Sequence, residues 1–417
     1  MEGERKPGAA AALTLLIGIN LFNYIDRQVL SAVEPEIRAT FFRANDPNAM
    51  ALTGALGTAF FVTYMLAAPI MGWLADRFHR WIIIGIAVGL WSLASGASGL
   101  ATSFGMLLAT RICVGIGEGG WGPAGPTLLS DLFPIRVRGR VMAAFAAAIP
   151  VGSALAYVIG GLVKVHLGWR WTFFLITPPG LVLALLCFFQ RDPRFGISTQ
   201  RASVVARRSD YRQLLSTRSY VINTLAQTAF TFALGGMAFW MPAYLEYRGL
   251  PKTTMTMFGG IIVIAGLIST LFGGSLADRM RDRFPSSYFL VSGVGMLLAF
   301  PFFVATLYTP FPAAWFFLFV AVFFAFLNIG PSNTALANVA MPLVRATAFA
   351  LNIFVIHILG DAIAFPIIGF VGGHWNMTIA FLLVSGMMLL AGLIWLFGMR
   401  GLAADTNAVE QASARVR

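Results

Sequence analysis

Residues 72–77 read GWLADR, and residues 274–279 read GSLADR, 202 positions later. Each copy follows an apolar run longer than the roughly 20 residues that a helix needs to cross about 30 Å of hydrocarbon. The two copies therefore mark equivalent places in two parts of one chain. This repeat decides the fold, because it divides the sequence into two halves of the same plan.

Two further pairs of landmarks support the duplication. The segment PIRVR ends at Arg138 and PLVR ends at Arg345, an offset of 207 residues. A Gly-Trp pair ends at Trp169 and a His-Trp pair ends at Trp375, an offset of 206 residues. Three landmarks at nearly one offset indicate a duplicated bundle of membrane helices. Parallel repeats of six spans are typical of alternating-access transporters.

The composition agrees with a membrane protein. Hydrophobic residues make up 58% of the 417 positions and charged residues only 11%, whereas soluble proteins carry about 25% charged residues. The two cysteines, Cys113 and Cys187, lie inside apolar runs, which excludes a disulfide scaffold and a cysteine-rich metal site. The four histidines are scattered, so we expect neither a metal site nor a cofactor.

The fold class expected is an all-α membrane protein with twelve transmembrane helices in two pseudo-symmetric six-helix bundles. The first run is too long, and too polar at its far end, for a cleavable signal peptide. The expected divisions are an N-terminal bundle 1–190, a linker 191–217, a C-terminal bundle 218–400 and a tail 401–417. The twelve apolar runs are 10–33, 51–74, 81–101, 104–131, 140–163, 169–190, 218–245, 254–277, 287–308, 311–340, 345–370 and 375–398.

The positions of Lys and Arg predict the orientation. With the N-terminus inside, cytoplasmic segments carry 21 of these residues and external segments carry six. Positive charge accumulates on the cytoplasmic side of membrane proteins, so we expect both termini to be cytoplasmic and the chain to lie in the cell (inner) membrane. The same bias accounts for the net charge of +12, and no nucleic-acid partner is needed to explain it.

Four ionisable residues lie inside predicted spans. Asp26 and Arg27 are in the first span, and Arg111 and Glu118 are in the fourth, seven positions apart and so on nearly one helix face. Buried charges in a helical bundle face a central cavity or each other. The bland interpretation is a static network that fixes helix packing. The functional one is a switch in which an acid takes up a proton when its arginine partner moves away.

Roles follow from the surroundings of each residue. Glu118 sits among glycines with no opposite charge beside it, which makes it the first candidate for proton coupling, and Asp26 is the second. A planar guanidinium grips phosphate or carboxylate well, so Arg111 is the candidate for an anionic headgroup. The predicted substrate-binding residues are Arg111, Arg27, Asn23, Tyr24, Asn223 and Gln227.

The repeated loops suit a cytoplasmic gate. Asp76 is expected to cap a neighbouring helix and to pair with Arg138 or Arg140, and Asp131 is expected to pair with cytoplasmic arginines. A tight helix turn without a gating role is the simpler alternative. The candidate gating residues are Asp76, Arg77, Arg80, Asp131, Arg138, Asp278 and Arg279.

The loop motif G-x-L-A-D-R-x-x-R at 72–80, the R-x-x-x-G-x-G run in the fourth span and the twelve-span plan resemble the major facilitator superfamily. Within it, NYIDR at 23–27, RICVGIGEGG at 111–120, and PTLLSDLF followed by IPVGSALAYVIGG resemble the Spinster family of lysolipid and sphingosine-phosphate transporters. The resemblance implies transport of a lipid-like anion, with the acidic residues in spans 1 and 4 involved in coupling.

Two other patterns have simpler explanations. Residues 115–120 fit G-x-G-x-x-G, but a dinucleotide site needs a preceding strand, and we expect these glycines to serve close helix packing. His357 and Asp361 are four positions apart and share a face. They form either a second titrating site or a structural pair, and we favour the structural pair.

We therefore expect a monomeric, proton-coupled secondary transporter of an amphiphilic anion, in contact with membrane lipids. A proton symporter of small organic anions such as sugar acids is the alternative within transport. An intramembrane enzyme is disfavoured because no nucleophile and base constellation, metal cluster or nucleotide motif is visible. A purely structural membrane protein does not need the charges of spans 1 and 4.

Overall fold

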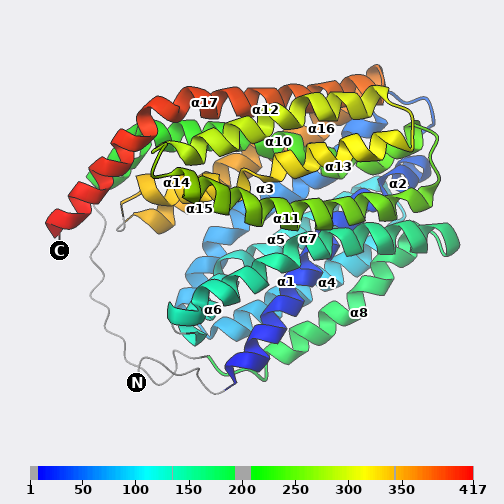
Figure 1. Ribbon diagram of the computed structural model, residues 1–417. Coiled ribbons are helices and arrows are strands. Elements are labelled where there is room, and N and C mark those ends of the chain that lie inside the picture. Colours follow the sequence, from blue (N-terminus) through cyan, green and yellow to red (C-terminus); the bar gives the residue numbers. More distant parts are fainter. Residues whose placement is uncertain (1–7, 134, 193–207, 342–343, 417) are drawn as a thin grey trace. The chain divides into compact units, whose positions relative to one another are not determined.

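The computed structural model describes residues 8–133, 135–192, 208–341 and 344–416, and every regular element in these ranges is a helix (Figure 1). The predicted all-α class is confirmed. Contacts divide the chain into two units, one of Met1–Gln200 with Phe239–Gly260 and the other of Arg201–Ala238 with Ile261–Arg417. Much of the predicted linker 191–217 lies outside the described residues.

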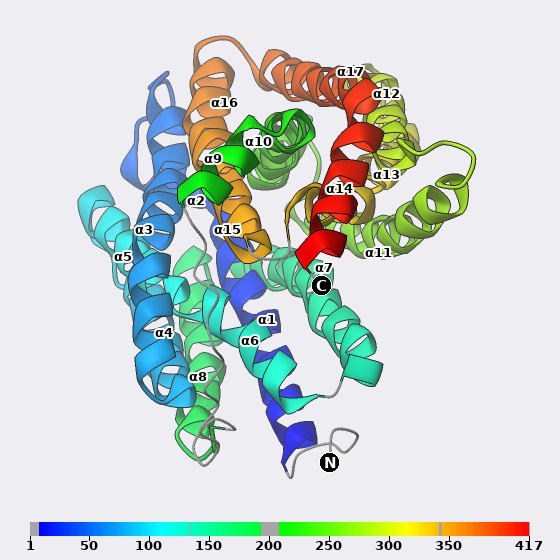
Figure 2. The same ribbon diagram turned by 90° about the vertical axis from the view of Figure 1, so that its left-hand side faces the viewer.

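In the first unit most helices pack against partners that do not follow them directly in the sequence. α1 packs along α7, α3 packs along α5, and α4 lies between α5 and α8 (Figure 2). Gly168 has a φ of 86° in the turn before α8, a backbone conformation that glycine adopts without strain. The helices are α1 (Ala9–Ala32), α2 (Glu34–Phe41), α3 (Ala49–Arg77), α4 (Arg80–Gly99), α5 (Phe104–Gly119), α6 (Trp121–Leu132), α7 (Ile135–His166) and α8 (Trp169–Cys187), followed later in the chain by η1 (Lys252–Thr254).

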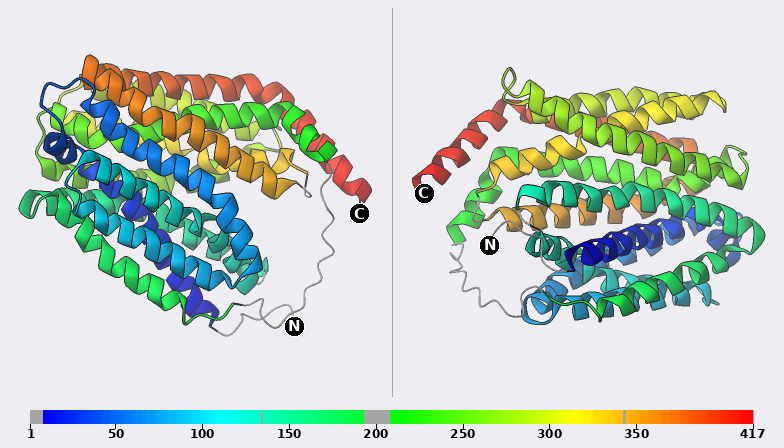
Figure 3. Two further views of the ribbon diagram at one scale, coloured as in Figure 1. Left: turned by 180° about the vertical axis from the view of Figure 1, so that it is seen from behind. Right: turned by 60° about the horizontal axis from the view of Figure 1, so that its bottom comes forward.

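In the second unit α12 lies between α13 and α17 (Figure 1). The last helix, drawn in red in Figure 3, continues from the predicted twelfth span through the predicted tail. Its Asp405 accepts a hydrogen bond from the backbone N–H of Ser219 at 2.9 Å. The end of α10 from Phe239 and the start of α11 up to Gly260 belong to the first unit. The elements are α9 (Arg208–Ser216), α10 (Arg218–Tyr247), α11 (Met255–Met280), α12 (Ser287–Tyr308), α13 (Ala313–Phe326), α14 (Ile329–Val339), α15 (Arg345–Ile356), the π-helical turn η2 (His357–Asp361), α16 (Ala362–His374) and α17 (Met377–Val416).

Ten helical stretches in the described residues are long and apolar enough to cross a membrane. The remaining two of the twelve predicted spans correspond to α5 with α6 and to α10. The span predicted at 104–131 is divided into α5 and α6 at Gly120, whose φ of −78° and ψ of −21° remain right-handed helical. α10 has the length but carries several polar side chains, including buried Asn223, Thr224 and Gln227.

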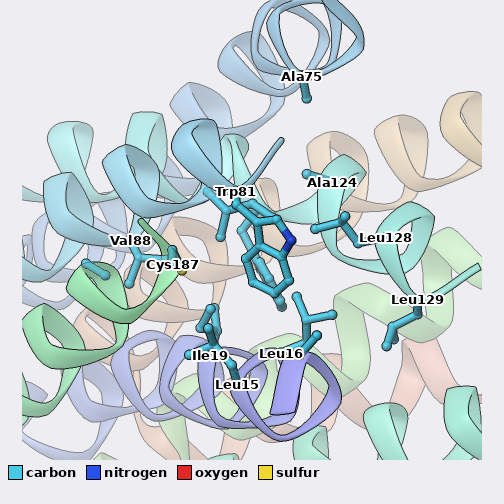
Figure 4. Close-up of a cluster of buried hydrophobic side chains, with 14 of the residues drawn as sticks. Leu15, Leu16, Ile19, Ala75, Trp81, Val88, Ala124, Leu128, Leu129 and Cys187 are labelled. Atoms are coloured by element: carbon cyan, nitrogen blue, oxygen red, sulfur yellow. The ribbon is translucent and has the colours of Figure 1, made fainter. Parts of the chain in front are cut away.

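An apolar core holds the first unit together around Trp81, which is fully buried. Figure 4 shows its indole between Leu16 and Ile19 of α1 and Leu128 of α6. Because membrane helices associate through close van der Waals packing, this cluster stabilises the junction between helices that are far apart in sequence. The site described below is built on this scaffold.

The glycines of α5 allow close helix contacts, as predicted from the sequence. A Cβ atom on Gly117 would lie 2.7 Å from the backbone nitrogen of Trp91 on α4, and one on Gly119 would lie 2.8 Å from Cβ of Ala67 on α3. Both distances are too short for a real side chain. The glycine run is therefore a packing surface, and the prediction that it is not a dinucleotide site agrees with its helical setting.

Candidate transport site

The first span and the fourth meet through an ion pair in the first unit. Arg27 Nε lies 2.6 Å from Glu118 Oε2, and the Glu118 side chain is fully buried while that of Arg27 is 13% exposed. Glu118 occupies the last turn of α5, immediately before the division between α5 and α6 at Gly120. A lone carboxylate is strongly disfavoured in such an environment, so Arg27 is the counter-ion that allows Glu118 to be charged there.

Aromatic rings surround the Arg27 guanidinium. Its Cζ atom lies 4.9 Å from the ring centre of Tyr64 and 5.3 Å from those of Tyr24 and Phe60. The negative faces of aromatic rings attract a cation by about 0.5–2 kcal/mol per favourable contact. Arg27 is therefore held by more than Glu118, and its charge remains stabilised when the carboxylate is neutral.

Asp26 and Arg111 are the second pair of opposite charges. Asp26 accepts a hydrogen bond from the Ser95 hydroxyl, and Arg111 donates from Nη2 to Ser98 Oγ at 2.5 Å. The Arg111 guanidinium also lies over the ring of Phe173, 5.2 Å from its centre. Both charged residues are almost completely buried, and each interacts electrostatically with the other.

Two polar atoms of this cluster have no hydrogen-bond partner in the described part of the chain, Oδ2 of Asp26 and Nε of Arg111. The side chains of Asn23 and Glu118 interact through a hydrogen bond. Buried polar groups of native proteins nearly always have partners. One unpaired acceptor and one unpaired donor side by side in this cluster are therefore suited to bind a polar solute or water.

The candidate residues of α10 lie in the second unit, in a buried hydrogen-bond network in which only Oδ1 of Asn352 lacks a partner among the described residues. Asn223 donates to the Ser332 carbonyl at 3.0 Å and accepts from the Trp395 indole at 2.9 Å. Gln227 donates to Ser332 Oγ at 2.9 Å and accepts from Asn352 at 2.7 Å. All five residues are buried, so these amides join α10 to α14, α15 and α17.

A third polar pair lies at the π-helical turn of the second unit. His357 Nδ1 and Asp361 Oδ2 are 2.6 Å apart, and the extra residue of this turn interrupts the regular hydrogen bonding between α15 and α16. Asp361 packs against Gly235 of α10, where a Cβ atom would collide with its carboxylate. The pair predicted from its spacing of four residues is thus formed.

The loop after α3 makes a polar junction with the ends of α6 and α8. Arg80 Nη1 lies 2.5 Å from Asp131 Oδ2, and the backbone N–H of Arg80 donates to Asp192 Oδ2 at 2.9 Å. Arg77 stacks over Trp73 of its own helix, with 4.0 Å to the ring centre. The predicted partners of Asp76 cannot be followed, since the side chains of Asp76, Arg138 and Arg140 lie outside those that the structure describes.

The equivalent loop of the second unit is arranged differently. Asp278 accepts a hydrogen bond from the Tyr288 hydroxyl at 2.9 Å, and Arg279 is exposed. Nη2 of the neighbouring Arg281 lies 3.4 Å from Oε1 of Glu410 on α17. The contacts of Arg80 have no counterpart here, because the equivalent position of the second unit is Asp282.

Sequence reasoning singled out Tyr24 but not the two serines, nor the rings of Phe60 and Tyr64. Ser95 and Ser98 belong to a run of small residues, LASGAS, which resembles an ordinary helix-packing surface. Phe60 and Tyr64 lie one turn apart on α3, and apolar spans contain many such rings. The only signal for the two serines was that their hydroxyl groups lie three residues apart in a predicted membrane helix.

Comparison with known proteins places this geometry in a family. The sequence profile of the Major Facilitator Superfamily matches residues 16–360. The chain is 35% identical over 375 residues to protein spinster homolog 3 of Danio rerio, covering 84% of this chain and 74% of that protein. The chain belongs to the Spinster family of the major facilitator superfamily. It is also 32% identical over 384 residues to a sphingosine-1-phosphate transporter of Danio rerio, covering 86% and 74% of the two proteins.

The fold of this Spinster-family chain is found in solved structures. A bacterial homologue of the human lysosomal transporter Spinster, in an inward-facing and unoccupied conformation, matches 98% of this chain and 99% of its own with a TM-score of 0.80 at 20% identity. A D-xylose–proton symporter matches with a TM-score of 0.72 at 18% identity, covering 92% of this chain and 96% of its own. The chain is a multi-pass membrane transporter with the twelve-helix architecture, and not an enzyme.

Proposed function

We propose that this chain is a proton-coupled secondary active transporter that moves an amphiphilic anion by alternating access. It acts as a monomer in the cell (inner) membrane with both termini in the cytoplasm, the orientation favoured by the excess of Lys and Arg in the loops on that side. The observation that carries the proposal is the buried ion pair between Arg27 and Glu118, at 2.6 Å, next to Asp26 and Arg111.

The ion pair supplies the coupling. A deprotonated Glu118 and an anionic substrate compete for the same guanidinium of Arg27. A proton on Glu118 cancels its charge, and the aromatic rings around Arg27 then hold the cation ready for the substrate. Proton binding and anion binding therefore favour each other, and by linkage each raises the affinity for the other by the same factor. Asp26 is the second acid of this system.

Arg111 supplies the main contact to the anion. Its Nη2 is engaged by Ser98, while its Nε has no partner among the described residues. A guanidinium presents several N–H groups to phosphate or carboxylate. We assign the headgroup to Arg111 and Arg27, with the amide of Asn23 and the ring of Tyr24 beside them.

The hydrogen-bonded amides of Asn223 and Gln227 support the second unit, so this proposal places the headgroup in the first.

Two observations favour an amphiphile over a small solute. Relatives at 32% and 33% identity are named sphingosine-1-phosphate transporters, and aromatic rings line the cationic group of this chain. Rings such as Phe60 and Phe61, which pack edge to face at 5.0 Å, offer apolar surface to a lipid tail.

The cytoplasmic loops provide the gate in this proposal. The ion pair between Arg80 and Asp131 links the loop after α3 to the end of α6, and the Asp278 hydrogen bond to Tyr288 fixes the corresponding loop of the second unit. Asp76, Arg77, Arg138 and Arg279 complete the set assigned to this side. Opening requires these contacts to be exchanged, and protonation or substrate binding biases the change by differential affinity for the two states.

Uptake into proteoliposomes with an imposed pH gradient tests the proposal. Sphingosine 1-phosphate and lysophosphatidic acid serve as amphiphilic anions, and gluconate serves as a small one. We expect gradient-driven accumulation of the amphiphiles by the parent protein, and its loss in Glu118→Gln with exchange across the membrane retained. Glu410→Gln is the matched control, because Glu410 is an exposed acid paired with Arg281.

Two results decide against the proposal. If Glu118→Gln concentrates substrate as the parent does, Glu118 does not couple transport to protons. If gluconate accumulates and the amphiphiles do not, the chain is a symporter of small organic anions.

A further inference from the structure

Two serines on one face of α4 each bind one member of an oppositely charged pair. Ser95 donates its hydroxyl hydrogen to Asp26 Oδ1, and Ser98 accepts from Arg111 Nη2. The two serines are three positions apart, so their side chains lie one above the other on the same face of the helix. α4 thus presents a hydroxyl to the acid of α1 and another to the base of α5.

The two charges do not form an ion pair with each other among the contacts of the described residues. Asp26 and Arg111 are nevertheless close enough for their charges to interact. Each also keeps an unpartnered atom in the described chain, Oδ2 on Asp26 and Nε on Arg111. In a buried site, two opposite charges this near would gain most by direct contact, unless other groups hold them apart.

The hydroxyl of Ser98 is itself fixed in orientation. It lies 3.1 Å from the Ala94 carbonyl and 2.8 Å from the Thr110 hydroxyl, and Thr110 lies 2.7 Å from the Leu107 carbonyl. These acceptors can take the hydroxyl hydrogens, which leaves an oxygen lone pair of Ser98 directed at Arg111. Ser98 therefore acts as a fixed acceptor.

The neighbouring face of α4 is fixed by close packing on α8. A Cβ atom on Gly96 would lie 2.7 Å from Oγ1 of Thr177, and one on Gly99 would lie 2.8 Å from the ring of Phe174. Because these glycines admit α8 at short range, α4 has little freedom to slide or rotate. The two serines are consequently held at a constant position relative to α5 and α1.

We propose that Ser95 and Ser98 are positioning residues that keep Asp26 and Arg111 from forming a direct ion pair, and so keep Arg111 open to an anionic headgroup. The inference rests on the proposed function in one respect, namely that Arg111 binds the anion. Without the Ser95 hydroxyl, Asp26 turns to Arg111 for its hydrogen bond, and the carboxylate then competes with the substrate for the guanidinium.

Binding to purified protein in nanodiscs provides the first test, with sphingosine 1-phosphate as the anionic probe and sphingosine as the probe without phosphate. We expect Ser95→Ala to weaken binding of sphingosine 1-phosphate by about tenfold or more, the size of a lost hydrogen bond to a charged group. Binding of sphingosine stays unchanged. Ser95→Thr, which restores a hydroxyl, restores the affinity. Ser92→Ala is the matched control on the same helix, because Ser92 Oγ has no partner in the described chain.

The Asp26→Asn background separates positioning from a general loss of structure. With no negative charge at position 26, nothing competes for Arg111, so Ser95→Ala should have no additional effect there. If the Ser95→Ala variant binds sphingosine 1-phosphate as tightly as the parent, the positioning role is wrong. It is also wrong if Ser95→Ala weakens this binding by the same factor in the Asp26→Asn background as in the parent. If Arg111→Gln binds the probe as tightly as the parent, the assignment of the headgroup in the proposed function fails instead.

A structure of the Ser95→Ala variant tests the inference without any ligand. We expect a nitrogen of Arg111 within about 4 Å of an oxygen of Asp26, the separation of an ion pair. If the two side chains keep their parent positions, the serines do not hold them apart, whatever the protein transports.

Discussion

Glu36 on the short helix α2 forms ion pairs with two lysines of the first unit. The pair with the buried lysine is predicted to contribute much more to stability than the pair with the exposed one. Its Oε2 lies 3.1 Å from Lys164 Nζ, and its Oε1 lies 2.7 Å from Lys252 Nζ. The Lys164 side chain is fully buried and also donates to the Ala32 carbonyl at 2.9 Å. The Lys252 side chain is 47% exposed.

The burial of Lys164 and the exposure of Lys252 determine how much stability each substitution is expected to cost. Glu36→Gln keeps the shape of the side chain but leaves a buried ammonium without its counter-ion, a loss of about 3–5 kcal/mol for buried pairs. The amide oxygen still accepts a hydrogen bond, so we expect a value of about 3 kcal/mol, the lower end of that range. Lys252→Ala breaks only a solvent-screened pair, which contributes about 0–1 kcal/mol.

The assay is the free energy of unfolding from denaturation of purified protein in mixed micelles, for the parent and both variants. We expect Glu36→Gln to lose several times more stability than Lys252→Ala. Equal losses in the two variants, or a larger loss for Lys252→Ala, would refute the reasoning, because the burial of Lys164 would then not determine the stability.

The remaining predictions concern both units. Burial raises the pKa of Glu34 above its ordinary value of 4.5. The folded chain then holds the proton of the Glu34 carboxyl more tightly than the unfolded chain does. The free energy of unfolding therefore falls as the pH rises from 4.5 through the folded-state pKa. Glu34→Gln keeps the hydrogen bond from Thr53 and should flatten this part of a plot of unfolding free energy against pH, whereas an unchanged slope would contradict the prediction. Asp192→Ala removes the carboxylate that accepts the first N–H of α4 and should lower the unfolding free energy by about 1 kcal/mol, while a neutral result would show that the bond contributes nothing. Gln227→Leu leaves its buried partners on α14 and α15 without their hydrogen bonds and should cost about 1–3 kcal/mol for each unpaired group, so a variant as stable as the parent would exclude a supporting role for the network.

The architecture was predictable because it is encoded locally. Hydropathy over windows of about 20 residues reveals the spans, and the two LADR loops reveal the repeat. The division of the fourth span into α5 and α6 at Gly120 was not predicted, although Pro123 and Pro126 follow it in the sequence. The hydropathy of a window does not record where regular helical hydrogen bonding is interrupted, because it takes no account of the backbone N–H that a proline lacks.

The sequence predicted that the charges of spans 1 and 4 lie together, but not which of them form an ion pair. The charges of spans 1 and 4 were expected to meet, yet Glu118 was selected because no opposite charge lies beside it in sequence. Its partner Arg27 is 91 residues away and reaches it only through the packing of two helices. Ser95 and Ser98 were not recognised at all, because a serine in a small-residue run has the same sequence signal whether it packs or binds a charge. Pairing across helices depends on helix rotation, which the sequence pattern fixes only approximately.

Proton movement driven by the substrate alone is the most direct test of the central claim. Proteoliposomes containing an internal pH-sensitive dye, with no pH gradient imposed, would receive an inward gradient of sphingosine 1-phosphate. Coupling through Glu118 predicts a change of internal pH that depends on substrate in the parent and is absent in Glu118→Gln, although that variant still exchanges substrate. Transport by the parent without any change of internal pH would contradict the account.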